Sequence, residues 1–365
     1  MYTTARKEKS PSGFLRSGPG LEMDFDERVR RKNAFDASLV YGTRNFNLLT
    51  GRDKYAEYRK RIDGSWIDPK TGKLDERVAA YRTCVVCGAD DSALAFVKSG
   101  FSHVRCKTCG LLYVNPMLSS GEHAEAYDKE GIYERVLESE EQIKMNRLEY
   151  NYYLDVIQMY LDKKEHIKIC DIGCGPGDLL VEAKKRGFTV LGIEPHPPSH
   201  RALTERQINF IPEYFPLKEP LQTKFDCVFF LNTIEHIKNP GAFIEKMSEL
   251  LEPGGLIYLS TPNLDAVSNR ILHEKAGAFG GHTHLQIFDR NTLPRLVERT
   301  GLEVLEVDTV ITELGTVKNY LSYKDPYFGD GADEEALAFL TPSLIYHHHL
   351  GRSLNLLART KGLSR

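Results

Sequence analysis

The sequence feature that most constrains this chain is a series of glycines directly after a short β-branched segment. Residues 167–172 read Ile-Lys-Ile-Cys-Asp-Ile, and glycines follow at alternate positions, Gly173, Gly175 and Gly177. This pattern is typical of a buried parallel strand that turns sharply into a helix. Because glycine has no Cβ, a ligand can lie against the backbone there, facing the N–H groups at the start of the helix. The sequence therefore predicts an α/β fold with a nucleoside-like cofactor at this turn.

The spacing of the glycines indicates which kind of cofactor to expect. The dinucleotide fingerprint requires Gly-x-Gly-x-x-Gly, but Asp178 occupies the last position when one counts from Gly173. An acidic residue at the start of the helix also disfavours a pyrophosphate, because two negative charges would meet. A second predicted strand ends in Glu194, 23 residues after Asp171. A carboxylate at that place can accept both ribose hydroxyls of a nucleoside.

The same residues resemble a known family. The pattern Asp-x-Gly-x-Gly-x-Gly over residues 171–177 resembles motif I of the class I S-adenosylmethionine-dependent methyltransferases. The cofactor of these enzymes carries a sulfonium and an ammonium but no phosphate, so carboxylates near the turn suit it. The resemblance implies that S-adenosyl-L-methionine binds here. The cofactor-binding residues that it implies are Asp171, Gly173, Gly175, Gly177, Glu194 and Asn232.

The C-terminal half continues the alternation of strands and helices. Asn232-Thr-Ile-Glu-His-Ile237 follows a predicted fourth strand, and Glu252-Pro-Gly-Gly255 ends a helix before the fifth. This series resembles the UbiE/UbiG-like branch of the methyltransferases, with a methyltransferase-23-type core. The resemblance implies a seven-stranded Rossmann-like sheet with helices on both faces. Later strands are predicted at residues 188–193, 224–231, 256–260, 301–311 and 353–360, and helices over 243–251 and within 281–300.

Four of the seven cysteines form two Cys-x-x-Cys pairs with 18 residues between them. These metal-ligand candidates are Cys84, Cys87, Cys106 and Cys109. Two such pairs supply the four thiolates of a tetrahedral Zn²⁺ site, and because no ligand position stays open, we expect a structural ion. Disulfides are the alternative, but they are not expected without an export signal. Alternating residues at 93–98 and 102–105 predict a hairpin between the pairs.

The second cysteine pair belongs to a segment with a resemblance of its own. Residues 106–116 resemble a zinc-ribbon module that precedes many bacterial methyltransferases acting on sugars, polysaccharides or secondary metabolites. The resemblance leaves two roles open for the module. It either helps to bind a substrate or partner, or it completes the fold.

The length of 365 residues exceeds one methyltransferase domain of roughly 200 residues, so several units are expected. The predicted organisation is an N-terminal helical and partly disordered extension (1–81), a four-cysteine zinc ribbon (82–116), a helical cap or linker (117–165) and a class I methyltransferase domain (166–365). Short helices are predicted at 25–34, 53–62 and 75–80 and a long one at 138–163, while residues 1–22 are expected to be disordered.

The composition restricts the partners. A net charge of −3 and a pI of about 6.5 give no general attraction to nucleic acid. No apolar run approaches the length of a membrane span, and residues 1–10 have no apolar segment behind them. We therefore expect a cytoplasmic enzyme with a small-molecule or carbohydrate substrate, no membrane and no nucleic acid, with a homodimer as an option.

Three histidines are candidates for the general base that a hydroxyl acceptor requires. His236 follows the fourth strand, and His282 and His284 lie in the loop after the fifth, so all three are expected at the ligand-binding edge of the sheet. His282 is the preferred base, because Gly277-Ala-Phe-Gly-Gly281 before it suits a moving lid. For His236 the alternative is a cap or packing against Pro240, and for His284 it is a structural hydrogen bond.

A divalent cation is a further option for this region. Glu235 and the three histidines offer suitable ligands, and some relatives with a Glu-His pair bind such an ion. Asn232 stands three residues before Glu235 in place of another acid, which weakens the idea.

The leading hypothesis is an S-adenosylmethionine-dependent methyltransferase that O-methylates a carbohydrate or small secondary metabolite. The first alternative is a C-methyltransferase for a nucleotide-linked deoxysugar. The second is a methyltransferase or binding module in which the zinc ribbon recognises RNA or protein. For this last reading the basic residues of the ribbon, Lys98, Arg105 and Lys107, are too few.

Overall fold

The structure is a computed structural model that describes residues 23–39, 44–119, 132–161, 166–321 and 337–361. Its centre is a seven-stranded sheet with the strand order β10-β9-β8-β11-β12-β15-β14. In chain order these strands are β8 Lys168–Ile172, β9 Thr189–Ile193, β10 Phe210–Ile211, β11 Phe225–Leu231, β12 Leu251–Pro262, β14 Glu303–Val310 and β15 Ser353–Arg359.

The directions of the strands determine where a ligand can bind. Strand β8 pairs in parallel with β9 and β11, and β11 pairs in parallel with β12. Strand β15 runs antiparallel to both of its neighbours, β12 and β14. The carboxyl ends of β8, β9, β11 and β12 therefore meet at one edge of the sheet, where ligands of open α/β sheets bind. The topology confirms the predicted seven-stranded Rossmann-like sheet.

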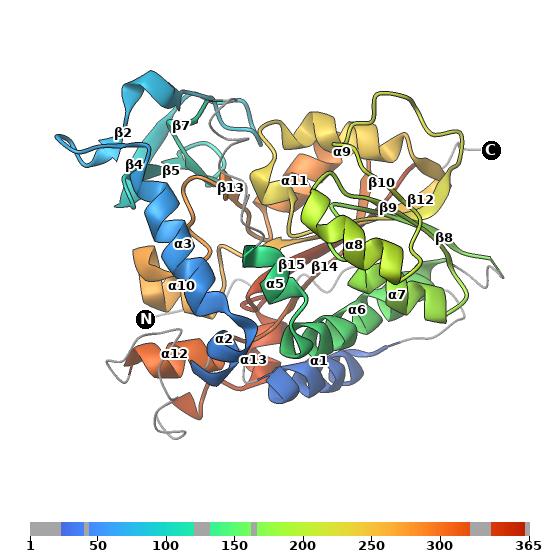
Figure 1. Ribbon diagram of the computed structural model, residues 1–365. Helices are drawn as coiled ribbons and strands as arrows, with labels where there is room; N and C mark the ends of the chain where they lie inside the picture. Colours follow the sequence, from blue (N-terminus) through green and yellow to red (C-terminus); the bar gives the residue numbers. More distant parts are fainter. Residues whose placement is uncertain (1–22, 40–43, 120–131, 162–165, 322–336, 362–365) are drawn as a thin grey trace, which may run out of the picture.

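Helices cover both faces of this sheet, as predicted (Figure 1). They are α6 Glu140–Tyr160, α7 Asp178–Lys185 and α8 Pro197–Glu205 on one face, and α9 Pro240–Ser248 and α11 Thr292–Arg299 on the other. The neighbours Phe229 and Phe230 of β11 belong to different core clusters, because successive side chains of a strand point to opposite faces. Every residue of β11 is buried, which explains its continuous apolar sequence.

Residues 82–118, here called the four-cysteine module, carry the cysteine pairs and most of a second, four-stranded sheet. Its order is β13-β6-β5-β4, with β4 Ser92–Lys98, β5 Phe101–Cys106, β6 Leu112–Val114 and β13 Gln286–Ile287. The predicted hairpin is thus present as β4 and β5. Strand β13 comes from the loop after β12, yet it lies beside the strands of the module (Figure 1).

Smaller elements surround these two sheets. The remaining strands are β1 Ile67–Asp68, β2 Lys73–Leu74, β3 Ala79–Ala80 and β7 Met117–Leu118. The remaining helices are α1 Phe25–Leu39, α2 Arg44–Thr50, α3 Arg52–Gly64, α5 Ile132–Leu137, α10 Val267–Leu272, α12 Leu314–Leu321 and α13 Pro342–His347, with 3-10 turns η1 Glu76–Val78, η2 Ile234–His236 and η3 His273–Lys275. Across the described ranges, no helix has both the length and the apolar character that crossing a bilayer requires.

Three local predictions are wrong. The helix predicted over 75–80 is only the short turn η1, because β3 pairs with β7 and this long-range pairing overrides the local preference. The turn predicted at 252–255 is part of β12, in an irregular stretch opposite the start of β11. The loop predicted within 281–300 contains β13. The predictions for residues 1–22 and for 120–131 lie outside the described residues.

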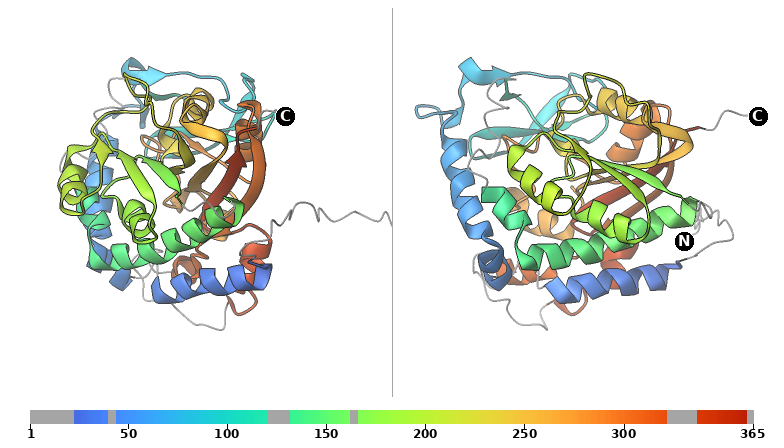
Figure 2. Two further views of the ribbon diagram at one scale, coloured as in Figure 1. Left: turned by 90° about the vertical axis from the view of Figure 1, so that its right-hand side faces the viewer. Right: turned by 45° about the vertical axis from the view of Figure 1, so that its right-hand side comes forward.

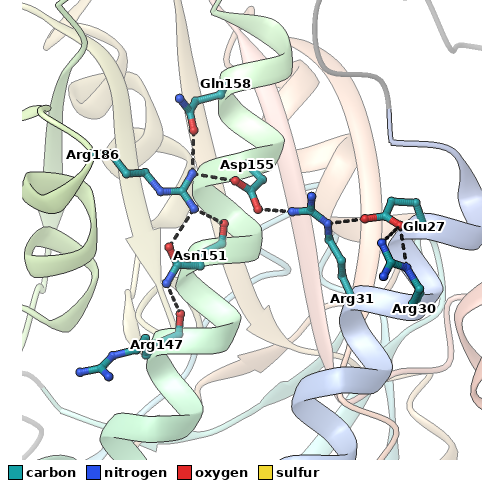
Figure 3. Close-up of polar contacts among 8 residues, drawn as sticks. All are labelled: Glu27, Arg30, Arg31, Arg147, Asn151, Asp155, Gln158 and Arg186. Atoms are coloured by element: carbon teal, nitrogen blue, oxygen red, sulfur yellow. Dashed lines mark hydrogen bonds and ion pairs between the residues drawn. The ribbon is translucent and has the colours of Figure 1, made fainter.

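Helix α1 of the N-terminal extension lies along α6, on the outside of the methyltransferase sheet (Figure 2). Polar contacts connect α1, α6 and α7, as Figure 3 shows. Arg31 of α1 pairs with Asp155 of α6, and Arg186, at the end of α7, reaches the same carboxylate at 2.7 Å. The Arg186 guanidinium also donates to Gln158 at 2.6 Å. These ion pairs are partly exposed, so each contributes little by itself.

A buried ion pair anchors α1 more firmly. Lys32 is 1% exposed, and its Nζ lies 2.8 Å from Asp308 Oδ1 on β14. The Tyr152 hydroxyl donates to the other oxygen of this carboxylate at 2.5 Å. Burial, the largest single effect, would raise the pKa of Asp308, but the Lys32 charge, the hydrogen bonds from Lys32 and Tyr152 and the charge of Arg28 together outweigh it and hold this pKa below its usual value.

We expect Lys32→Met to lower the free energy of unfolding by about 3 kcal/mol, because it leaves the Asp308 carboxylate buried without its closest cation. Arg30→Met is the matched control on the same helix, since the Arg30 side chain is 77% exposed, and it should cost less than about 0.5 kcal/mol. Urea unfolding near neutral pH measures both values. The lowered pKa of Asp308 adds stability that is complete above its unfolded pKa and is lost in acid. The difference between wild type and Lys32→Met should therefore narrow at low pH, and equal losses in both variants would contradict the assignment.

Candidate functional site

The glycine turn after β8 has the conformation that its sequence predicts. Gly173 and Gly177 have φ values of +74° and +82°, in the region that favours glycine. A Cβ on Gly177 would lie 2.7 Å from Leu203 Cδ2, and one on Gly173 would lie 3.1 Å from Thr233 Oγ1. Gly177 is also the N-cap of α7. A larger residue at either position would therefore combine a strained backbone conformation with a close side-chain contact.

Two carboxylates lie at the turn. Glu194, at the end of β9, is 6% exposed. One of its oxygens accepts the N–H of Gly175 at 2.8 Å and the other accepts the N–H of His196 at 2.8 Å. Asp171 is 3% exposed, and its Oδ1 has no hydrogen-bond partner among the described residues. Burial, followed by the charge of Glu194, raises the pKa of Asp171 well above its usual value. A buried carboxyl oxygen without a partner beside a bare backbone turn fits a cationic cofactor.

The Asp178 carboxylate does not present an unpaired negative charge to a ligand. Arg206 Nη1 lies 2.6 Å from one of its oxygens, and Asn146 donates to the other at 2.8 Å. The negative charge of Asp178 is thus neutralised locally, and the glycine spacing alone distinguishes this turn from a dinucleotide site.

The carboxyl end of β11 borders the glycine turn. Asn232 is exposed and has a φ of +48°, and its N–H donates to the Ser260 carbonyl at 2.7 Å. Thr233, which would contact a Cβ on Gly173, comes next in the chain. The two segments that were predicted to bind the cofactor therefore touch each other.

The 3-10 turn η2 follows directly and carries Glu235 and His236. Glu235 is 1% exposed, and burial raises its pKa to about 7, although the Thr261 hydroxyl donates to it at 3.0 Å. His236 Nε2 lies 3.7 Å from Glu235 Oε1. The His236 and His284 rings meet edge to face, with 4.9 Å between their centroids. Candidate ligand atoms of Glu235, His236 and His284 all lie within 4.8 Å of one another.

The backbone sets the orientation of both rings. His236 Nδ1 lies 2.8 Å from the Thr283 carbonyl, and His284 Nδ1 lies 2.7 Å from the Ala278 carbonyl. A carbonyl only accepts hydrogen bonds, so in each neutral ring Nδ1 carries the proton and Nε2 carries the lone pair. Each Nε2 is then the nitrogen that can accept a proton or bind a metal ion.

The four cysteines of the module converge as a metal site requires. The Sγ atoms of Cys84 and Cys109 are 3.4 Å apart, those of Cys87 and Cys106 are 3.5 Å apart, and all four lie within 4.8 Å of one another. These distances are close to the edges of a tetrahedron of thiolates around zinc, roughly 3.8 Å for a Zn–S bond of about 2.3 Å. They are too long for disulfide bonds, and all four cysteines are free.

The local backbone also fits zinc. Gly88 and Gly110 each follow a cysteine pair with positive φ, at +78° and +84°. Their N–H groups donate to the carbonyls of Cys84 and Cys106 at 2.7 and 2.9 Å, which closes the tight turn around each pair. The four-thiolate set is therefore suited to one structural Zn²⁺ ion.

Comparison with known proteins identifies the larger unit. Residues 145–307 match the family model described as a methyltransferase domain. The chain contains a class I S-adenosylmethionine-dependent methyltransferase domain. The ubiquinone biosynthesis O-methyltransferase of Leptothrix cholodnii is 26% identical to it over 170 residues, which cover 41% of this chain and 70% of that protein. The mitochondrial protein of the same description from Rattus norvegicus is 28% identical over 156 residues, 38% of this chain and 45% of its own length.

Two solved structures match at low sequence identity. A SAM-dependent methyltransferase from Archaeoglobus fulgidus matches with a TM-score of 0.44 and 16% identity, over 64% of this chain and 100% of that chain. The plantazolicin methyltransferase BpumL, solved in complex with SAH, matches with a TM-score of 0.39 and 17% identity, over 60% of this chain and 83% of its own.

Within the methyltransferase domain, the structure groups the predicted histidines unequally. His236 and His284 lie side by side next to Glu235, whereas His282 packs elsewhere. The His282 ring is 1% exposed and lies 5.6 Å from the Trp66 ring and 6.5 Å from the Phe101 ring, between centroids. His282 is thus placed at the contact with the N-terminal part of the chain.

Sequence reasoning missed two polar residues of this site. Thr261 binds Glu235, and Gln286 binds the backbone of η2. Neither belongs to a motif, so their roles appear only when the chain is folded.

Glu194→Ala should weaken S-adenosylhomocysteine binding by at least about tenfold, because the variant loses a carboxylate that orders the turn and that is predicted to accept the ribose hydroxyls. Glu205→Ala is the control, since Glu205 ends α8 close by in the chain and its side chain is 67% exposed. Isothermal titration calorimetry with S-adenosylhomocysteine measures both. Unchanged affinity in Glu194→Ala would remove this residue from the cofactor site.

The purified protein should contain about one zinc ion per chain, held by the four thiolates. Cys106→Ser should lose the ion, while Cys227→Ser, which alters a fully buried cysteine of β11, should keep it. Metal analysis with a colorimetric chelator measures the content of each variant. Full zinc content in Cys106→Ser would contradict the assignment.

Proposed function

We propose that the methyltransferase domain transfers the methyl group of S-adenosylmethionine to a hydroxyl of a small acceptor, a carbohydrate or a secondary metabolite. One observation carries this proposal. The glycine turn contacts the segment that leads into η2, since a Cβ on Gly173 would lie 3.1 Å from Thr233 Oγ1. The proposed donor site and the proposed base, His236, are therefore neighbours along one edge of the sheet.

The cofactor supplies an electrophilic methyl group on a sulfonium. An alcohol or sugar hydroxyl is a poor nucleophile near neutral pH unless a base removes its proton. His236 is suited to this role, because its Nδ1–H is held by the Thr283 carbonyl and its Nε2 carries the lone pair. The ionised Glu235, 3.7 Å from Nε2, then stabilises the imidazolium that forms.

His284 and His282 are the alternatives for this role. His284, like His236, has its Nδ1 at a backbone carbonyl, and its ring meets that of His236 edge to face. His282, preferred on sequence grounds, is almost completely buried against two aromatic rings, which supports a packing role instead. The names of the relatives, which are O-methyltransferases of ubiquinone biosynthesis, support oxygen as the acceptor atom. No observation on the described residues favours carbon methylation or a macromolecular acceptor.

The test uses S-adenosylmethionine with a ¹³C-labelled methyl group and a panel of phenols and methyl glycosides. We expect an O-methyl signal in the NMR spectrum of the product. His236→Asn should lower kcat by about 10²-fold or more while S-adenosylhomocysteine still binds, because only the proton acceptor is lost. His166→Asn is the control, since His166 is exposed and precedes the amino end of β8, opposite the edge at which the site lies. A C-methyl product would contradict methyl transfer to oxygen. A full rate in His236→Asn would contradict the role of His236 as the base.

The pH profile of the same reaction gives an independent readout. Burial raises the pKa of Glu235 to about 7, so its carboxylate forms as the pH rises through that value. Catalysis needs the ionised carboxylate and the neutral imidazole, and the rate should therefore rise with pH, with an apparent midpoint that belongs to the pair. Glu235→Gln should move this midpoint to lower pH, because the imidazole then titrates without the carboxylate that stabilises its protonated form. An unchanged profile would exclude the pair.

A further inference from the structure

The four-cysteine module and the methyltransferase domain share a strand. Strand β13 adds to the edge of β6, with Gln286 opposite Tyr113 and Ile287 opposite Leu112. The Val114 N–H donates to the Leu285 carbonyl at 2.9 Å and extends the pairing by one bond. Strand β6 begins three residues after Cys109, so the geometry of the metal-binding turn passes directly into this strand.

The side chain of Gln286 connects this strand to η2. Gln286 is completely buried, and its Nε2 donates to the carbonyls of Ile234 and Ile237 at 2.9 Å each. The preceding residue, Leu285, donates its N–H to the Glu235 carbonyl at 2.8 Å. Two neighbouring residues thus bind three of the carbonyls in and directly after the turn that carries the proposed base.

The module holds the other end of the same amide. Arg82 Nη1 donates to Gln286 Oε1 at 3.0 Å, and its Nη2 donates to the Leu285 carbonyl. Arg82 stands two residues before Cys84, and its guanidinium lies over the Tyr113 ring at 5.3 Å from the centroid. Both ends of the Gln286 amide are therefore engaged, with the oxygen bound to the module and the nitrogen bound to η2.

We propose that Gln286 is a positioning residue for the acceptor half of the active site, through which the four-cysteine module fixes the turn of Glu235 and His236. The proposal rests on the function proposed above for that turn. The cofactor half is organised differently, since Glu194 binds the backbone of Gly175 and His196 within its own segment. Loss of the connection should displace the acceptor half and leave cofactor binding intact. A displacement of about 1 Å in such a site is enough to impair catalysis strongly.

The deciding variant is Gln286→Glu in the intact chain. Glutamate keeps an acceptor for Arg82 but has no N–H groups for the carbonyls of Ile234 and Ile237, so it breaks only the connection to η2. Gln286→Ala breaks both connections. The matched control is Gln158→Ala, because the Gln158 amide also accepts from an arginine, Arg186 at 2.6 Å, but on α6 (Figure 3).

Neither of the two measurements requires a methyl-acceptor substrate. NMR with ¹⁵N-labelled histidine reports which ring nitrogen of His236 is protonated, with the signals assigned through His236→Asn, and calorimetry reports the affinity for S-adenosylhomocysteine. In both Gln286 variants we expect the His236 signals to shift away from those of the Nδ1-protonated ring. The His200 signals should stay, and the affinity for S-adenosylhomocysteine should change by less than about twofold. Removal of zinc from the wild type by a mercurial and a chelator should shift His236 in the same direction.

Unchanged His236 signals in Gln286→Glu, or an equal disturbance in Gln158→Ala, would overturn the proposal. If Gln286→Ala loses its fold and with it S-adenosylhomocysteine binding, Gln286→Glu and the zinc-removed wild type decide. A failure of the proposed function is seen separately, because full methyl transfer by His236→Asn refutes the base and leaves the NMR result for Gln286 standing.

Discussion

The parallel pairing of β8 with β11 is the interaction on which the site depends. Phe229 lies opposite Asp171 in this register, so both strands end at the same level of the sheet. The glycine turn leaves β8 there, and Asn232 begins the segment to η2 there. Because β11 is buried on both faces, a slip by one residue would move each of its side chains into the opposite core cluster and would disturb the packing of both. The pairing therefore brings the proposed cofactor turn into contact with the segment that leads to the proposed base.

The sequence reveals those parts of the fold that depend on local patterns. Apolar strands, the glycines and the cysteine spacing each act within a few residues, and the sheet and the cluster of four cysteines are found where they are predicted. Strand β13 is two residues long and has no periodicity, so only its partner β6 defines it. The position of His282 also depends on long-range contacts and could not be predicted from the sequence. Its ring packs near Trp66 and Phe101, which come from distant parts of the chain.

The site contains ionisable groups whose burial costs stability. Asp171 and Glu235 both have a raised pKa, and burial is the main cause for each. Such groups are tolerated only where the surrounding structure is rigid enough to hold them. Around Glu235 this rigidity comes from hydrogen bonds that Leu285 and Gln286 donate to the backbone of η2 and the residue after it. Near Asp171 it comes from the glycine turn, where Thr233 and Leu203 pack closely against Gly173 and Gly177.

The support that η2 receives from outside its own segment explains why a small metal-binding module accompanies a domain that has its own core. The module's Val86, Leu111 and Tyr113 belong to the same core cluster as Phe230 of β11, so the two units share one apolar interior. A methyltransferase sheet ends in long loops at its ligand edge, and loops by themselves are mobile. The pairing of β13 with β6 holds one such loop against the four-cysteine module. A zinc ion bound by the four thiolates would restrict the backbone on the proposed acceptor side without approaching the reacting atoms.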